Sequence, residues 1–140
     1  MKLKSAAFAL AAAAAVAAPA WARNDTLTLD IAPVKELPDY KGQIGDFKFG
    51  FGGKPRGAVI GPTSSRQAAN GVGKKSEVAC DRALLNVLIR LKKDALNRGG
   101  TSVQGLVSMT TGAPFDSATQ FQCISGGTNA RVYMAGSVVK

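Results

Sequence analysis

The chain has 140 residues, which fits one small domain, and a formal net charge of +9. It contains no histidine and only two cysteines. A Ser-His-Asp triad and a His-ligated haem are therefore excluded, and a zinc site has too few of its usual ligands. Composition thus predicts neither a metal site nor a cofactor.

The N-terminus has the pattern of a secretory signal peptide. Two lysines precede the uninterrupted apolar run 6–18, and the small residues Ala20 and Ala22 stand at positions −3 and −1 of a cut before Arg23. As a helix the apolar run is about 20 Å long, short of the ~30 Å hydrocarbon core of a bilayer. We therefore predict cleavage between Ala22 and Arg23 rather than a transmembrane anchor.

Export of this kind determines how the rest of the sequence is interpreted. We predict a signal peptide over 1–22 and a single, soluble periplasmic domain over 23–140, with its core at about 46–140. No cysteine stands near the cut, so the protein is not expected to be a lipoprotein. An oxidising compartment favours a disulfide between Cys80 and Cys123. A redox pair is the alternative, but such cysteines usually lie close together, as in Cys-x-x-Cys.

The charge of the predicted mature chain favours anionic partners. Without Lys2 and Lys4, 16 basic residues face 9 acidic ones, a net charge of +7. In the periplasm such a surface meets lipid headgroups, lipopolysaccharide phosphates and acidic proteins, whereas the chromosome is absent, so we expect no specific nucleic-acid binding. A basic surface that serves only solubility is the alternative.

The first half of the predicted domain is read as short strands separated by turns. Residues 26–31 (TLTLDI) alternate apolar and polar, which is typical of an edge strand. Residues 33–40 form a polar connector with two prolines, and 46–51 (DFKFGF) alternate again with three phenylalanines on one face. Two further short strands are predicted at 58–60 and 67–72.

One long helix is predicted over residues 76–98. Ser76 is the expected N-cap, and two glycines follow the last residue. Apolar residues at helical spacing form a buried stripe: Cys80, Leu84, Val87, Leu88, Leu91 and Ala95. The opposite face carries Arg82, Arg90 and Lys93 and is a candidate surface for binding phosphates or acidic groups, although a merely solvated face is the alternative.

The remaining residues are predicted to form strands. Residues 103–110 are a candidate strand, 111–117 a loop, and 119–124 with 131–139 a hairpin. The fold class that follows is α+β: one long amphipathic helix packed on an antiparallel β-sheet in a single small domain.

The glycine-rich stretch before the helix does not match a phosphate loop. The Walker pattern places a glycine five residues before its Gly-Lys pair and a serine or threonine directly after it. Around Gly73 and Lys74 those positions hold Ala68 and Lys75. No catalytic constellation is recognisable elsewhere, so we predict that the protein is not an enzyme.

Several segments resemble a family of small exported proteobacterial proteins often labelled "excinuclease ATPase subunit". The resemblance extends from Phe47 to Lys140, about two-thirds of the chain, and rests on these matching pieces: DFKFGFG (46–52), GKKSEVACDRALLNVLIRL (73–91), ALNRGGTSV (95–103), SATQFQC (117–123) and MAGSVVK (134–140). The label implies DNA repair with ATP hydrolysis, which needs Walker motifs and zinc-binding cysteines. The residues do not support that activity.

The link from helix to strand is similar, more remotely, to two other groups. In the periplasmic domain of the Rcs outer-membrane stress sensor and in YbjQ-like proteins, a helix ending in a small residue and glycine packs on an antiparallel sheet. Residues 98–103 (RGGTSV) match that link in part. The sensor is a lipoprotein with two disulfides, so the resemblance implies the fold and not the sensor role.

These observations favour a non-catalytic envelope protein. Its partner would be an envelope protein or an anionic surface, bound through a sheet edge or through the basic helix face. The alternative is a small-ligand binder or an enzyme whose site the sequence does not identify. The identity of the partner and the oligomeric state are not predicted.

Overall fold

The computed structural model describes residues 24–140, so the predicted signal peptide and the cut between Ala22 and Arg23 lie outside it. The described chain is an α+β domain in which three helices accompany one sheet. In chain order the elements are β1 (Asn24–Asp30), α1 (Ala32–Lys35), α2 (Tyr40–Ile44), β2 (Lys48–Phe51), β3 (Val59–Asn70), α3 (Ser76–Asn97), β4 (Ser102–Ser108), β5 (Gln120–Gly126) and β6 (Asn129–Val139).

The six strands form one sheet in the order β1-β5-β6-β4-β2, and β3 pairs with the other side of β6. The predicted antiparallel sheet is confirmed only in part, because the sheet is mixed: β2 and β4 pair in parallel, while the other pairs are antiparallel. Parallel neighbours need a long crossover. Here β3 and α3 together supply it.

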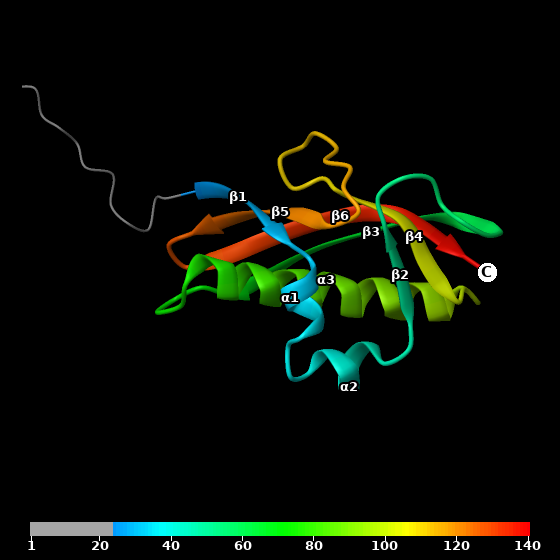
Figure 1. Cartoon of the computed structure of the whole chain (residues 1–140), viewed down its shortest axis with the longest axis horizontal. Helices are drawn as coiled ribbons and strands as arrows, with labels where there is room; N and C mark the ends of the chain where they lie inside the picture. Colours follow the sequence, from blue (N-terminus) through cyan, green and yellow to red (C-terminus); the bar gives the residue numbers. More distant parts are fainter. Residues whose placement is uncertain (1–23) are drawn as a thin grey trace, which may run out of the picture.

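Helix α3 lies along one face of the sheet, whereas the loop between β4 and β5 stands above the opposite face (Figure 1). All six predicted stripe residues of α3 are buried, and they are joined by Ala79, Ala83 and Leu85. From the sheet, Val103, Leu106, Phe121, Val132 and Met134 complete the core. Packing apolar helix and sheet faces against each other removes both from water, and this is the main source of stability.

The segment predicted as a polar connector contains two short helices instead. Val34 of α1 and Ile44 of α2 are buried in the core, before the predicted start of that core. Lys92 of α3 donates hydrogen bonds to the carbonyl oxygens of Gln43 and Ile44, at 3.0 and 2.9 Å. The bond to Gln43 satisfies a carbonyl at the end of α2, and the bond to Ile44 adds to the one that its carbonyl accepts from the N–H of Phe47. Local sequence patterns reveal neither bond.

The two strands predicted at 58–60 and 67–72 are one strand. β3 pairs with β6 in continuous register from Gly61 to Asn70. Pro62 is accommodated because β3 is an edge strand, where the missing N–H faces away from β6.

The ends of α3 differ in how well they were predicted. Lys75, and not Ser76, is the N-cap, with extended backbone angles and no capping hydrogen bond from its side chain. At the other end Gly99 has φ +76°, and Gly99 and Gly100 donate to the carbonyls of Leu96 and Ala95. These two bonds form the Schellman motif that the glycine pair predicted.

Cys80 of α3 and Cys123 of β5 form the predicted disulfide, with their Cα atoms 5.9 Å apart. Both side chains are fully buried. β5 pairs with β6 only at Ile124 and Ser125, next to the hairpin turn. Beyond that point the main chain of Gln122 is bonded to the side chains of Ser108 and Thr110 instead of to β6. The disulfide adds a covalent link from the β1–β5 ribbon to the helix next to these bonds.

Candidate binding surface

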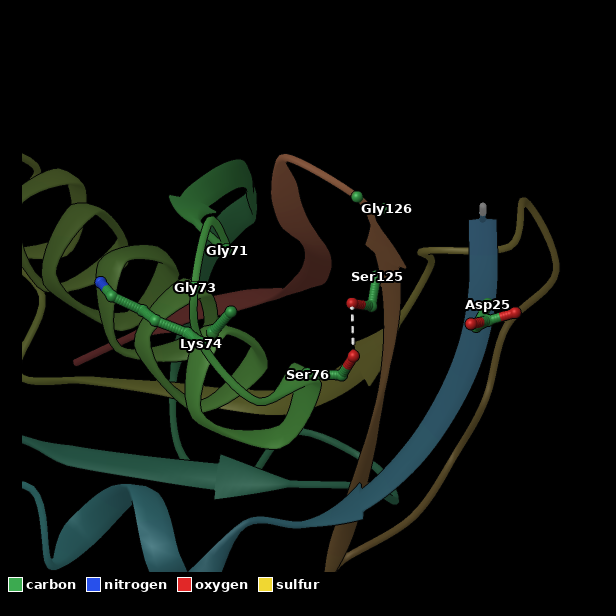
Figure 2. Close-up of a pocket in the computed structure, with 9 residues that line it drawn as sticks. Asp25, Gly71, Gly73, Lys74, Ser76, Ser125 and Gly126 are labelled. Atoms are coloured by element: carbon green, nitrogen blue, oxygen red, sulfur yellow. Dashed lines mark hydrogen bonds between the residues drawn. The ribbon is translucent and has the colours of Figure 1, made fainter. Parts of the chain in front are cut away.

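The glycine-rich stretch singled out in the sequence borders a cavity of about 250 Å³ beside the start of α3 (Figure 2). Ser125 Oγ donates a 2.9 Å hydrogen bond to Ser76 Oγ in this cavity. The side chain of Lys74 points away from both serines, and Asp25 lies across from them. The two hydroxyls are thus engaged with each other, and the lysine does not face them.

The charges around this cavity also disfavour a phosphate. Asp25 lines it, and Glu77 stands in the first turn of α3. A helix N-terminus attracts anions, but Glu77 already lies at the positive end of the dipole, and Asp25 adds a second carboxylate across the cavity. The arrangement lacks the lysine that a phosphate loop directs at its ligand.

The predicted basic face of α3 divides into two parts. Arg82 forms an ion pair with Asp39, and its guanidinium lowers the pKa of that carboxyl through a hydrogen bond. Arg90 and Lys93 are exposed and have no ion pair within residues 24–140. The part of the face open to a partner is therefore the pair Arg90 and Lys93.

Strand β3 runs beside these two cations and has one free edge. The N–H of Tyr133 donates to Thr110 Oγ1 and its carbonyl accepts from Met109, so both groups point away from β3. Arg66, the partner of Tyr133 in the register, is therefore a non-hydrogen-bonded position. Because alternate residues of a strand share an orientation, Ser64, Arg66 and Ala68 direct their N–H and carbonyl groups away from the sheet.

Two hollows accompany this edge. One, of about 320 Å³, is lined by Gln67, Asn86, Ile89, Arg90 and Lys93. The other, of about 530 Å³, is lined by Arg90 together with Pro62, Thr63, Ser64, Asp94, Tyr133, Ala135 and Gly136. Arg90 belongs to both hollows. We call the group Ser64, Arg66, Gln67, Asn86, Arg90 and Lys93 the α3–β3 surface.

The one carboxylate that lines these hollows, Asp94, is already hydrogen-bonded by its neighbours. Thr63 Oγ1 donates a 2.7 Å hydrogen bond to Asp94 Oδ2, and Arg98 Nη1 donates another at 2.9 Å. The Thr63 hydroxyl and then Arg98 hold the pKa of Asp94 below its ordinary value of 3.8. Asp94 is thus charged at neutral pH, and the charge of Arg90 also lowers its pKa although the two residues form no ion pair. Asp94 therefore offsets part of the charge of Arg90.

A third cation stands on the other side of the β3 edge. The guanidinium carbon of Arg66 lies 4.7 Å from the centre of the Tyr133 ring, a cation–π contact. Arg66 has no carboxylate partner among the described residues. Stacking on Tyr133 holds Arg66 in place without cancelling its charge.

Sequence reasoning identified Arg90 and Lys93 but missed Arg66 and the open edge. Arg66 lies between the two short strands predicted at 58–60 and 67–72, so the sequence does not place it on a strand edge. The signal that could have found it is Pro62, because a proline inside an extended run indicates an edge strand.

Residues 24–140 contain no group of three or more histidine, cysteine, aspartate or glutamate residues that could hold a metal ion. No helix in the same range combines the length and apolar character needed to cross a membrane.

The fold and the surface together define a small disulfide-bonded α+β domain with a basic, open sheet edge. Comparisons with protein-family models, with curated proteins and with solved structures find no match for this chain. The residues of the α3–β3 surface are therefore the basis for assigning a function.

Proposed function

We propose that this protein is a non-catalytic binding protein that holds an anionic partner on its α3–β3 surface. The observation that carries the proposal is the position of Arg66, Arg90 and Lys93. All three lie along an unpaired sheet edge beside two hollows, and none has an ion-pair partner among the described residues.

The balance of charge supports an anionic partner over a neutral one. Fifteen lysines and arginines face nine acidic residues in 24–140, and only two ion pairs form there. A surface of one sign attracts oppositely charged partners and speeds their association. The local density of cations at the α3–β3 surface makes it the preferred point of contact.

We further propose that the protein acts in the periplasm and belongs to the exported family that it resembles. The signal pattern before Arg23 supports export, and the disulfide between Cys80 and Cys123 suits an oxidising compartment. ATP hydrolysis is not part of the proposal, because Lys74 points away from the serines beside the glycine-rich stretch. An ATPase assay on the mature protein and on Lys74→Ala tests that point, and turnover lost in the variant would contradict it.

The main experiment compares two double variants that remove the same charge. Arg90→Gln with Lys93→Gln changes the α3–β3 surface, whereas Lys54→Gln with Arg56→Gln changes exposed residues of the β2–β3 loop. Binding of fluorescent poly-L-glutamate is measured by anisotropy at several salt concentrations. Two charge contacts of about 0.7 kcal/mol each predict an affinity loss of about tenfold for the first variant.

The control variant should lose much less, because it changes only the overall charge. Equal losses in both double variants would show that the charge acts over the whole molecule and would contradict a site at the α3–β3 surface. Vesicles containing phosphatidylglycerol are tested in parallel. Vesicle binding without poly-L-glutamate binding would identify a membrane surface as the partner and exclude an acidic protein.

A further inference from the structure

We propose that the anionic partner is an acidic, extended segment of another protein, which adds as a strand to the β3 edge at Ser64–Arg66. This inference rests on the proposed function and specifies its partner and its mode of binding. In this mode main-chain hydrogen bonds supply affinity, while side chains on alternating sides supply specificity.

The first argument is that α3 covers the β3 edge at both ends and leaves its middle open. Arg98 Nη1 donates to the carbonyl of Pro62 at 2.8 Å, and Asn86 Nδ2 donates to the carbonyl of Ala68 at 3.1 Å. These two covered carbonyls are six residues apart, about 20 Å along a strand. Between them, the N–H and carbonyl groups of Ser64 and Arg66 face outward without a hydrogen bond to another described residue.

This selective coverage matters because open sheet edges promote unwanted pairing. Proteins usually block such edges with proline, charge or a covering element. Here Pro62 and the side chains of Arg98 and Asn86 block the ends, whereas Ser64 and Arg66 are exposed. Two consecutive outward-facing residues offer up to four main-chain hydrogen bonds to a short segment and too little edge for a long sheet to grow.

The second argument is the arrangement of charge around the opening. Arg66 stacks on Tyr133 on the sheet face opposite α3, whereas Arg90 and Lys93 belong to α3 itself. Side chains of an added strand alternate between the two faces. Carboxylates at successive positions of the segment would therefore meet Arg66 on one face and Arg90 or Lys93 on the other.

A second copy of this chain is a weaker candidate for the occupant. Pairing of two β3 edges would bring Arg66, Arg90 and Lys93 of each copy together, and like charges repel. The free edge of β1 carries Asp25 and Asp30 and has the opposite charge. Pairing β1 of one copy with β3 of the next would use two different edges, and such contacts tend to build open chains of molecules. Repulsion between strongly basic copies opposes that assembly.

An anionic lipid is also a weaker candidate, because headgroups would use the cations but not the main-chain groups. The distinguishing experiment therefore removes one outward N–H and leaves every charge in place. Ser64→Pro does this, since the N–H of Ser64 takes no part in the β3–β6 ladder. Ser64→Ala is the matched control, because it loses the same hydroxyl and keeps the N–H.

The probe is a fluorescent peptide with two adjacent glutamates flanked by valines, so that carboxylates lie on both faces of the added strand, and binding is measured by anisotropy. We expect Ser64→Pro to weaken binding by about tenfold or more, because a carbonyl of the peptide is left without its donor. Ser64→Ala should stay within about twofold of the wild type. Melting temperatures show whether each variant has kept its fold.

A second measurement does not depend on the fold of any variant. Two further peptides carry N-methyl groups on alternate residues, one on the odd-numbered residues and the other on the even-numbered residues. In one of the two, the methyl groups replace the N–H groups that would donate to the β3 edge. We expect one of the two N-methylated peptides to lose binding to the unaltered protein and the other to retain it. Amide resonances of Ser64 and Arg66 should shift on addition of the unmethylated peptide.

The outcomes separate this inference from the proposed function. If Ser64→Pro and both N-methylated peptides bind normally while Arg90→Gln with Lys93→Gln binds poorly, strand addition is refuted and the charged site stands. If the charge variant also binds normally, the proposed function is wrong. If the protein alone forms larger oligomers as its concentration rises, the occupant of the β3 edge is another copy of this chain. That result would refute an acidic segment of another protein as the partner.

Discussion

Removing the Cys80–Cys123 disulfide should destabilise the protein strongly and should loosen one part of it first. The cysteines are 43 residues apart in sequence, and a loop of that length corresponds to about 4 kcal/mol in the chain-entropy model. For a domain of this size, that loss lowers the melting temperature by roughly 12–20 °C. Typical domains are stable by about 5–15 kcal/mol in total, so the fraction lost is large.

The position of the bond determines where the loss appears. β5 is bonded to β6 at only two register positions, and the side chains of Ser108 and Thr110 bond the main chain of Gln122. The β1–β5 ribbon therefore depends on these few bonds, on the disulfide and on buried side chains such as Phe121. After reduction, amide hydrogens of β1 and β5 should exchange faster than those of β3 and β6. Stability is rarely uniform across a fold, and the weakly attached unit opens first.

Two forms of the protein separate the bond from the packing of its sulfur atoms. Reduction keeps both side chains, whereas Cys80→Ala with Cys123→Ala also removes buried volume and should be somewhat less stable than the reduced wild type. The double variant should not respond to reductant. An unchanged melting temperature after reduction, with two free thiols confirmed by mass, would refute the reasoning, as would ready labelling of both thiols in the native protein.

Three other predictions follow from particular residues. The intact mass of exported protein should begin at Arg23, and a membrane-bound form that retains Met1 would contradict the predicted cleavage. Gly136→Ala should destabilise the protein by about 1–3 kcal/mol in denaturant unfolding, because the added Cβ would lie 2.8 Å from the carbonyl oxygen of Gln104, whereas Gly42→Ala, with nothing within 4 Å, should be neutral or slightly stabilising. The lowered pKa of Asp94 means that its contribution to stability is present above the ordinary value of 3.8 and is lost as the pH falls through the folded pKa. In Thr63→Val the Asp94 pKa, followed by NMR, should rise towards 3.8 and this acid dependence should weaken; an unchanged pKa would contradict the role given to the Thr63 hydroxyl.

The features that the sequence predicted well depend on neighbours along the chain. The buried stripe of α3 follows from helical periodicity, its end follows from Gly99 and Gly100, and the last hairpin follows from alternation around a glycine-rich turn. The disulfide was predictable because the chain has only two cysteines. In each case the physical cause acts within a few residues or leaves a single possible pair.

The features that the sequence missed depend on residues distant along the chain. The parallel pairing of β2 with β4 is set by the crossover through β3 and α3, and the short helix α2 is held by Lys92, almost fifty residues further on. Ser76 looked like an N-cap, but its hydroxyl bonds Ser125 instead. The preference of a serine for the N-cap position is outweighed here because a tertiary contact offers its hydroxyl another partner.

The candidate site shows the same division. The sequence by itself determined that Arg90 and Lys93 would share an exposed face of a long helix, because their spacing follows the helical repeat. Only the tertiary structure placed Arg66 across the strand from them, paired Arg82 with Asp39, and covered the β3 edge at Pro62 and Ala68 while leaving Ser64 and Arg66 open. The free edge belongs to β3, the side chains that cover its ends come from α3 and its C-cap, and the cations come from both elements. Only the packing of α3 against β3 brings them together.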